Sequence, residues 1–207
     1  MVTVRSVTRE RAFVCILLDT GERFWLRGDD LYGSDITEGA SFDAGAFLQK
    51  IRVLQYPRAL NHAVAMLARR PCSRGEIRSR LVSRRYTEDV AELVVYKLEK
   101  EKLLDDEAFC DQWIRFRSGR GYGRSVIRRE LKMKEVPEEM IDAAFALLDP
   151  EEEADAAVRL ARKAWNRIRP GEDIRKARQK VISSLVRKGY GWEEARAAAE
   201  KAENQEE

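Results

Sequence analysis

Few residues in this 207-residue sequence could perform acid–base or nucleophilic catalysis. His62 is the only histidine, and it lies in an alanine-rich stretch with no cysteine or carboxylate near it in sequence. Ser-His-Asp and Cys-His sites need an imidazole as general base, so any such site would depend on this residue alone. The simpler interpretation is a partly exposed helical histidine. We therefore predict that the protein is not an enzyme and has no catalytic residues, which excludes a hydrolase or nuclease.

Two further patterns contain residue types found in metal or phosphate sites. Acidic residues cluster between residues 105 and 111, but acids are favoured in the first turn of a helix without any metal. Gly119, Gly121 and Gly123 resemble a phosphate-binding loop, yet the Gly-Lys-Ser/Thr ending and a preceding strand are missing. A turn between helices explains these glycines, so we predict neither a metal nor a cofactor.

A dense group of arginines surrounds the same glycines and is interleaved with Phe116 and Tyr122. Its members are Arg115, Arg117, Arg120, Arg124, Arg128 and Arg129. Guanidinium groups bind phosphate and carboxylate with two parallel hydrogen bonds. One interpretation is a set of internal ion pairs with the acidic third helices of neighbouring repeats, each contributing only about 0.2–1 kcal/mol when exposed. The other is an external polyanionic or acidic protein partner, which we favour, with Arg74 and Arg78 in a supporting role.

These arginines stand on a pattern that occurs three times, about fifty residues apart. In each copy two apolar residues are four apart, as on one face of a helix. The pairs are Ile77 with Leu81, Ile127 with Leu131, and Val181 with Leu185. Five residues after each pair comes an aromatic or branched residue, namely Tyr86, Val136 and Tyr190. Self-similarity at this period is typical of stacked supersecondary units that cannot bury their apolar faces alone.

Charge follows the same period. The formal net charge is only +3, but it is −6 over residues 86–111, +7 over 112–134, −9 over 135–158 and +9 over 159–188. Charged residues make up 36% of the chain, against about 25% in a typical protein. The predicted second helices are therefore basic, and the third helices start with acids.

Local signals place several helices. Ser73 with Glu76 predicts a capping box, and Thr87 is a good N-cap for the next helix. Phe109, Trp113 and Phe116 follow at helical spacing, so we expect all three in the core.

Residues 1–55 have a different character. Alternation over 2–7, an apolar run over 13–18 and a turn at 19–22 leading into 23–26 predict a small antiparallel sheet or a hairpin. A helix starting at Ser41 or Asp43 is expected to cover the sheet, because so few strands cannot stand alone.

Pro57 is expected to separate this module from the helices that follow, because proline disfavours helix at the preceding residue. In the next predicted helix, residues 59–69, the apolar stripe consists of Leu60, Val64 and Leu67.

The cysteines Cys15, Cys72 and Cys110 lie far apart without metal-ligand spacing, as expected of buried thiols in a reducing compartment. No apolar run is long enough to span a membrane, and no export signal opens the chain. We predict a soluble cytoplasmic protein.

With these motifs the sequence resembles the RecX regulators of the bacterial RecA recombinase. The residues that carry the resemblance are 104–109, 117–118, 121–123 and 127–131, with 73–81 for the first repeat and 185–190 for the third. One departure is Cys110, where the family usually has alanine. The resemblance spans about residues 57–200.

The resemblance implies a mainly α protein, a tandem array of three three-helix repeats preceded by a small β-rich N-terminal module. We place the module at 1–55 and the repeats at 56–103, 104–150 and 151–207, the last with a frayed acidic tail from Glu203. The resemblance also implies a monomer that binds the RecA–DNA filament and lowers recombinase, ATPase and coprotease activity. Contact with single- or double-stranded DNA within the filament is expected, and contact with a membrane is not.

The alternative is a direct DNA-binding protein of helix-turn-helix type, because units of three short helices can resemble that fold. Acids at the start of each third helix oppose the insertion of that helix into a groove lined by phosphates.

Overall fold

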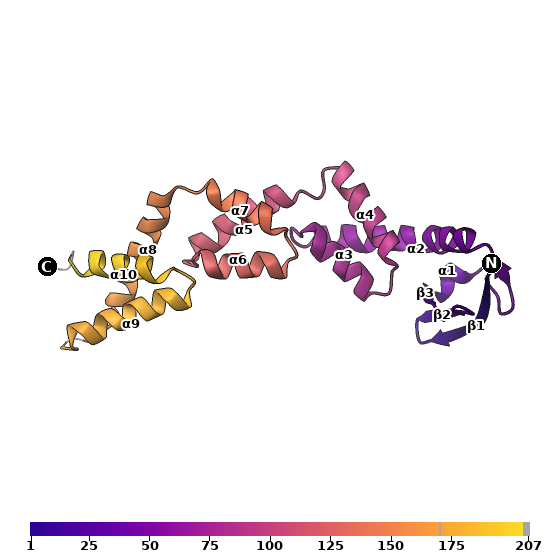
Figure 1. The fold of residues 1–207 in the computed structure, drawn as a ribbon, viewed down its shortest axis with the longest axis horizontal. Helices are drawn as coiled ribbons and strands as arrows, with labels where there is room; N and C mark the ends of the chain where they lie inside the picture. Colours follow the sequence, from indigo (N-terminus) through magenta and orange to yellow (C-terminus); the bar gives the residue numbers. More distant parts are fainter. Residues whose placement is uncertain (170, 205–207) are drawn as a thin grey trace. The chain divides into compact units, whose positions relative to one another are not determined.

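The computed structural model describes residues 1–169 and 171–204. The chain divides into two compact units, Met1–Asp105 and Asp106–Glu207. The first contains a small sheet and helices, and the second is helical throughout its described residues (Figure 1). The predicted fold class, mainly α with a β-rich N-terminal module, is confirmed.

The N-terminal sheet is antiparallel, with strand order β3-β2-β1-β4. The strands are β1 (Val2–Glu10), β2 (Phe13–Leu18), β3 (Arg23–Arg27) and β4 (Ser41–Phe42). The three predicted strands are confirmed. The sequence gives no sign of β4, because a strand of two residues has no alternation to detect; a short helix, α1 (Gly28–Leu31), precedes it.

The face of the sheet that carries Val4, Ile16 and Leu26 is buried under helix α2 (Ala44–Leu67). Phe47 of α2 packs edge-on against Phe24, with ring centroids 5.2 Å apart. Asp43 caps the helix, accepting a hydrogen bond from the Ala46 backbone N–H at 3.1 Å. The predicted covering helix is thus confirmed.

The predicted break at Pro57 is wrong, because α2 runs through this residue without interruption. Its N-terminal half packs on the sheet through Phe47 and Ile51, and its C-terminal half packs on the next two helices through Ala59 and Ala63. Pro57 lies on the exposed side. Packing at both ends therefore offsets the hydrogen bond that proline removes from the helix.

Helices α3 (Arg74–Ser83) and α4 (Glu88–Lys100) complete the first three-helix set with α2. The buried residues of α2 here are Ala59 and Ala63, whereas Val64 is 45% exposed. The predicted stripe is therefore wrong at Val64. Small alanines lie at the interface because they let the helix backbones approach closely.

Both predicted caps in this set are confirmed. Ser73 accepts a hydrogen bond from the Glu76 N–H at 3.1 Å, and the Glu76 carboxylate accepts one from the Ser73 N–H at 3.4 Å. Thr87 caps α4 by accepting from the Val90 N–H.

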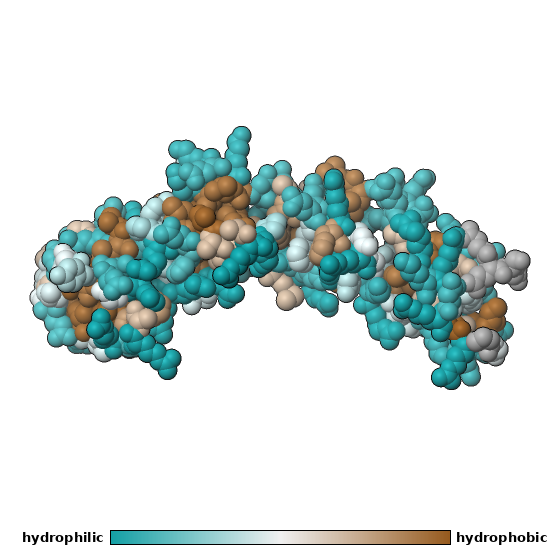
Figure 2. Space-filling view, turned by 180° about the vertical axis from the view of Figure 1, so that it is seen from behind, coloured by the Kyte–Doolittle hydropathy of each residue, from teal (hydrophilic) through white to brown (hydrophobic). Residues whose placement is uncertain are grey.

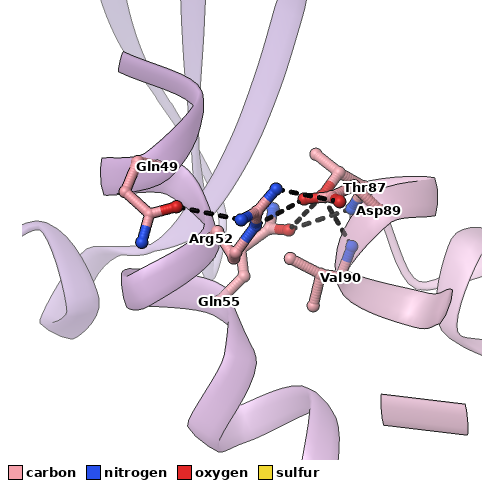
Figure 3. A network of polar contacts seen from close by, with 6 residues as sticks. All are labelled: Gln49, Arg52, Gln55, Thr87, Asp89 and Val90. Atoms are coloured by element: carbon pink, nitrogen blue, oxygen red, sulfur yellow. Dashed lines mark hydrogen bonds and ion pairs between the residues drawn. The ribbon is translucent and has the colours of Figure 1, made fainter. Parts of the chain in front are cut away.

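Gln55 is a buried polar side chain that ties α2 to its neighbours (Figure 3). Its amide donates to the Trp25 carbonyl oxygen at 2.7 Å, and its oxygen accepts from the Thr87 N–H at 2.9 Å. Nearby, Arg52 donates two hydrogen bonds to Asp89, at 2.7 and 3.0 Å. The sheet and the first helices are therefore joined by hydrogen bonds as well as by apolar packing.

The second unit contains two further three-helix sets. The first set comprises α5 (Asp106–Gly119), α6 (Arg124–Met133) and α7 (Glu138–Ala146). The second comprises α8 (Pro150–Trp165), α9 (Ile174–Arg187) and α10 (Trp192–Glu203). Each has a hydrophobic core of its own, centred on Ile127 and Leu131 in one and on Val181 and Leu185 in the other.

The predicted core of α5 is only partly correct. Phe109 is buried and Trp113 is partly buried, but Phe116 is 48% exposed. Cys110 and Ile114 fill the core instead, so the buried side of α5 is centred away from Phe116. The prediction for Phe116 is therefore wrong.

The second helix of each set ends in the same hydrogen-bonded cap. In α3, the Tyr86 N–H donates to the Leu81 carbonyl and the Arg85 N–H donates to the Val82 carbonyl. This pattern is a Schellman motif, and it places Arg85 in the left-handed region with φ of 72°. The equivalent left-handed residues are Glu135 after α6 and Gly189 after α9. The cap explains the aromatic or branched residue that repeats in the sequence, because this residue packs back onto the helix it closes.

Two glycines join the two sets of the second unit. The Gly123 N–H donates to the Lys188 carbonyl at 2.8 Å, and the Ser125 N–H donates to the Gly189 carbonyl at 3.0 Å. A Cβ atom on Gly123 would lie 2.6 Å from backbone atoms of Gly189. The turn at 119–123 is therefore a site of close backbone packing.

Three remaining expectations concern the cysteines, membrane spans and the C-terminus. Cys15, Cys72 and Cys110 are buried, and none of them forms a disulfide within the described residues. Over the residues described, no helix is long and apolar enough to cross a membrane.

Glu203, where fraying was expected to begin, ends α10 and accepts hydrogen bonds from Arg178 at 2.8 and 2.9 Å. The rest of the predicted tail from 205 onward lies outside the described residues.

Candidate functional site

The arginines singled out in the middle of the sequence lie on α5, on the turn after it and on α6. Ile127 and Leu131 bury the inner stripe of α6, which leaves the basic residues on its remaining surface. The structure separates these arginines by their surroundings, which the sequence could not do.

Arg117 is a structural residue. Its guanidinium binds the carboxylate of Glu130 through two nitrogen atoms, with the Nε–Oε2 distance at 2.6 Å. The Trp113 Nε1–H donates to the same carboxylate at 3.1 Å, and the guanidinium lies over the Tyr122 ring at 3.8 Å. Its side chain is only 15% exposed. The hydrogen bonds to Glu130 raise the pKa of Arg117, so the pair is a charged link between α5 and α6.

Arg124 connects the two three-helix sets of the second unit. Its Nε donates to both carboxylate oxygens of Glu153 on α8, at 2.8 and 2.9 Å. Hydrogen bonding to Glu153 raises the pKa of Arg124. Arg124 is therefore held by an acid of the neighbouring set.

Arg128 is paired within its own set. Its Nη1 contacts the Asp142 carboxylate and lies 3.5 Å from Glu138, both on α7. Lys132 adds a second cation beside Glu138 at 2.6 Å. The acids at the start of α7 are therefore occupied by cations of α6.

The first unit repeats this arrangement fifty residues earlier. Arg78 of α3 contacts Glu92 and Glu88 of α4, the latter at 3.3 Å. Arg74 binds Glu99 at 2.9 Å. Internal ion pairs thus form at Arg74, Arg78, Arg117, Arg124 and Arg128, but with other partners than the third helices of neighbouring repeats that we considered. Most of them form within one set, and Arg124 pairs with the first helix of the next set.

The other three arginines remain exposed. Arg115 and Arg129 form no ion pair with the residues that the structure describes. Arg120 stacks its guanidinium over the exposed Phe116 ring at 4.1 Å. An open groove follows the surface of α6 and is lined by Ser125, Arg128, Arg129, Lys132 and Met133. A phosphate or carboxylate partner can reach Arg115, Arg120 and Arg129 without displacing an internal acid.

Hydrophilic side chains cover most of the face shown in Figure 2, with separate apolar patches between them. Within residues 1–169 and 171–204, no three His, Cys, Asp or Glu side chains are grouped to hold a metal ion. The candidate site is the charged surface formed by Arg115, Arg120 and Arg129.

His62 has surroundings that the sequence did not predict. Its Nδ1 lies 2.8 Å from the Tyr86 hydroxyl, and the two side chains share a hydrogen bond. Burial lowers the pKa of His62, and the charges of Arg84, Arg58 and Arg27 lower it further. In the sequence, the only sign of a hydrogen-bond partner for His62 is that Tyr86 occupies a position that recurs in the three repeats.

Comparison with known protein families assigns all three helical sets. The first three-helix domain of RecX matches residues 59–98. The second matches residues 105–144, and the third matches residues 151–199. Regulatory protein RecX of Mycolicibacterium smegmatis is 35% identical over 138 residues, covering 64% of this chain and 73% of the relative. Regulatory protein RecX of Clostridium perfringens is 26% identical over 190 residues, covering 91% and 87%.

Solved structures share the fold. A crystal structure of regulatory protein RecX covers 99% of this chain and all of its own, with a TM-score of 0.63 and 23% identity. RecX from Lactobacillus salivarius covers 72% of this chain and 96% of its own, with a TM-score of 0.65 and 22% identity. Each of the three helical sets matches a RecX domain, and the relative from Mycolicibacterium smegmatis is 35% identical. The chain therefore belongs to the RecX family of regulatory proteins.

Proposed function

We propose that this chain is a non-enzymatic regulator that binds the RecA–DNA filament as a monomer and lowers recombinase, ATPase and coprotease activity. Support comes from the family and from one structural observation. Arg115, Arg120 and Arg129 are exposed cations of the second three-helix set without an acidic partner among the described residues. They are free to meet phosphates of single- or double-stranded DNA, or acidic side chains, on the filament.

The remaining arginines have a supporting role in this proposal. Arg117, Arg124 and Arg128 hold the helices that present the free cations, and Arg74 and Arg78 do the same in the first unit. Arg128 also lines the groove on α6, so it contributes positive charge there while remaining bound to α7. Regulation then needs no chemistry on the protein itself, only attachment to the filament.

Direct reading of DNA by a helix-turn-helix is the less favoured function. The third helix of the second set, α7, starts with Glu138 and Glu139, and the third helix of the first set starts with Glu88 and Asp89. Negative charge at these positions repels the phosphates on either side of a DNA groove.

The proposal is tested by the DNA-dependent ATPase rate of preformed RecA filaments titrated with this protein. Substoichiometric and equal ratios are compared, and binding to the same DNA without RecA is measured in parallel. We expect inhibition at concentrations where free DNA is not bound. Tight DNA binding without an effect specific to RecA would instead support the helix-turn-helix alternative.

A matched pair of variants locates the contact. The double variant Arg115→Glu/Arg129→Glu should raise the concentration for half-maximal inhibition about tenfold or more, equivalent to about 1.4 kcal/mol. The double variant Lys176→Glu/Lys201→Glu is the control with the same change of charge, because Lys176 and Lys201 are exposed cations of α9 and α10 outside the proposed surface. Both proteins should keep the wild-type melting temperature. Equal loss of inhibition in the two variants would show that net charge, and not this surface, is responsible.

A further inference from the structure

The first unit contains a concave site between its sheet and its first three-helix set. Its lining includes Phe13 at the start of β2, Arg27 at the end of β3, His62 on α2, and Arg84, Arg85 and Tyr86 at the end of α3. The cavity volume is about 310 Å³. Residues from four elements thus converge on a space large enough for a small ligand.

The lining is positively charged and contains no carboxylate. Arg84 and Arg27 form no ion pair with any described residue, and Arg27 lies 5.4 Å from the centre of the Phe13 ring. Among the residues that the structure describes, Arg85 pairs with one acid, the exposed Glu10 at 3.7 Å. The nearby Asp30 is already bound to Arg58 by two hydrogen bonds, at 3.0 and 2.8 Å. The cavity therefore has an excess of positive charge that the protein itself does not neutralise.

Arg85 and the backbone beside the cavity are held in place by their neighbours. Arg85 is in the left-handed region, and its guanidinium lies over the Trp25 ring at 3.8 Å and over the Phe13 ring at 5.4 Å. The Gln55 amide binds the carbonyl oxygens of Trp25 and Arg85, at 2.7 and 3.4 Å, and its oxygen holds Thr87 (Figure 3). A binding site whose side chains are fixed in advance loses less entropy when a ligand enters.

We propose that this cavity binds a nucleotide, with its phosphate between the guanidinium groups of Arg27 and Arg84 and its base against the planar surface of Phe13 and Arg85. Guanidinium groups recognise phosphate oxygens with paired hydrogen bonds. Nucleic-acid bases stack on aromatic rings and on arginine planes. The nucleotide can come from a single strand of nucleic acid or from a free mononucleotide, since both have this chemistry. The site uses none of the arginines of the proposed filament contact, so each proposal can fail without the other.

Because His62 is the only histidine, its imidazole gives a unique NMR signal inside the cavity. The full-length protein is titrated with inorganic phosphate, with thymidine 5′-monophosphate and with a short oligothymidylate. We expect the His62 signals to shift saturably with the nucleotide ligands. The bound anion should also raise the pKa of His62, because it opposes the charges of Arg27, Arg58 and Arg84 that face the ring. The other groups that face His62 are the Tyr86 hydroxyl and the Asp30 carboxylate, which is bound to Arg58. Both are present in every sample, so a change in the pKa of His62 on titration reports on the added ligand.

The variant Arg84→Ala should weaken nucleotide binding at least tenfold, and Arg27→Gln gives an independent second test. Arg80→Ala is the control, because Arg80 is an exposed arginine of the same helix outside the cavity. Binding of the oligothymidylate alone would identify the source as a strand, and equal binding of the mononucleotide would identify a free nucleotide. No saturable shift with any ligand would overturn the site. Equal affinity for inorganic phosphate and the nucleotides, or equal loss in Arg80→Ala and Arg84→Ala, would overturn the assignment to a nucleotide.

Discussion

Arginines that look alike in the sequence have different physical roles in the folded chain. Arg117 lies over the Tyr122 ring and binds the Glu130 carboxylate, whereas Arg115, two residues away, is exposed without an ion pair among the described residues. Successive helical residues point in different directions, so a spacing of two places one side chain inward and the other outward. Removing a bound arginine therefore affects stability, and removing an exposed one affects only what the surface can bind.

Arg117→Ala should lower the free energy of unfolding of the second unit by about 1.5–3 kcal/mol, because it removes two hydrogen bonds to a charged, half-buried Glu130. Arg115→Ala should change it by less than about 0.5 kcal/mol, as expected for an exposed side chain. Urea denaturation followed by circular dichroism measures both. Equal stability of the two variants would contradict the structural role of Arg117.

The pKa of His62 gives the first unit a defined pH dependence. This pKa is lowered in the folded protein, mainly by burial, from an ordinary value of 6.5. When the pH falls below 6.5, the unfolded chain takes up a proton at this position before the folded protein does. The contribution of His62 to the free energy of unfolding should therefore be fully present well above pH 6.5 and should decrease as the pH falls through 6.5 toward the lowered pKa of His62.

Denaturation in urea at pH 7.5 and pH 5.5 checks this expectation. His62→Gln serves as the comparison, because glutamine can reach Tyr86 with a polar group but does not titrate. The wild type should lose more stability than the variant between the two pH values. An identical loss in both proteins would assign the pH dependence to other groups.

At the scale of the elements, α2 unites two parts of the chain that differ in sequence character. One half of the helix completes the core of the sheet, and the other completes the core of the first three-helix set. Separation at Pro57 would expose both of these faces. Burying them outweighs the local preference of proline, which costs about 3 kcal/mol in the middle of a helix.

Replacing Pro57 by alanine should stabilise the first unit. The new N–H can donate to the Val53 carbonyl within the helix, and we expect a gain of about 1–3 kcal/mol, less the entropy that the unfolded chain regains. Pro71→Ala is the matched control, since it loosens the unfolded chain equally but lies outside helices α2 and α3. Thermal unfolding should show a higher melting temperature for Pro57→Ala only. A decrease in both variants would contradict this account of α2.

At the scale of the molecule, each compact unit is held together by a few contacts between its parts. In the first unit these include the hydrogen bonds of Gln55 and the Arg52–Asp89 pair. In the second they include the Gly123–Gly189 approach and the Arg124–Glu153 pair. The finer partition into four domains at 55, 103 and 150 stays a prediction, because the compact units divide only after Asp105.

The variant Gly189→Ala should destabilise the second unit by about 2–4 kcal/mol, from left-handed strain together with steric overlap. Gly189 has φ of 95°, and its Cβ would lie 2.6 Å from the Val126 nitrogen. Gly119→Ala is the control, because nothing lies within 4 Å of its Cβ. Its effect should be below about 1 kcal/mol. Comparable destabilisation by the two changes in differential scanning calorimetry would rule out a specific role for the close approach.

The sequence by itself determined the mainly helical fold, the three repeats, the helix caps and the strands of the N-terminal sheet. These features depend on contacts between near neighbours, such as Ser73 with Glu76, or on periodic apolar residues such as Ile127 and Leu131. Local rules therefore predict them. The family also follows from the sequence, because the repeat motifs are its signature.

Only the tertiary structure decided the course of α2 through Pro57, the exposure of Val64 and Phe116, and the division of the arginines into bound and exposed. It also brought Phe13, His62 and Arg84 together around one cavity. These outcomes depend on side chains far apart in sequence. Glu153, for example, binds Arg124 from 29 residues away and Gln55 joins Trp25 to Thr87. No local pattern encodes such meetings, because they arise only when separate helices and strands pack against one another.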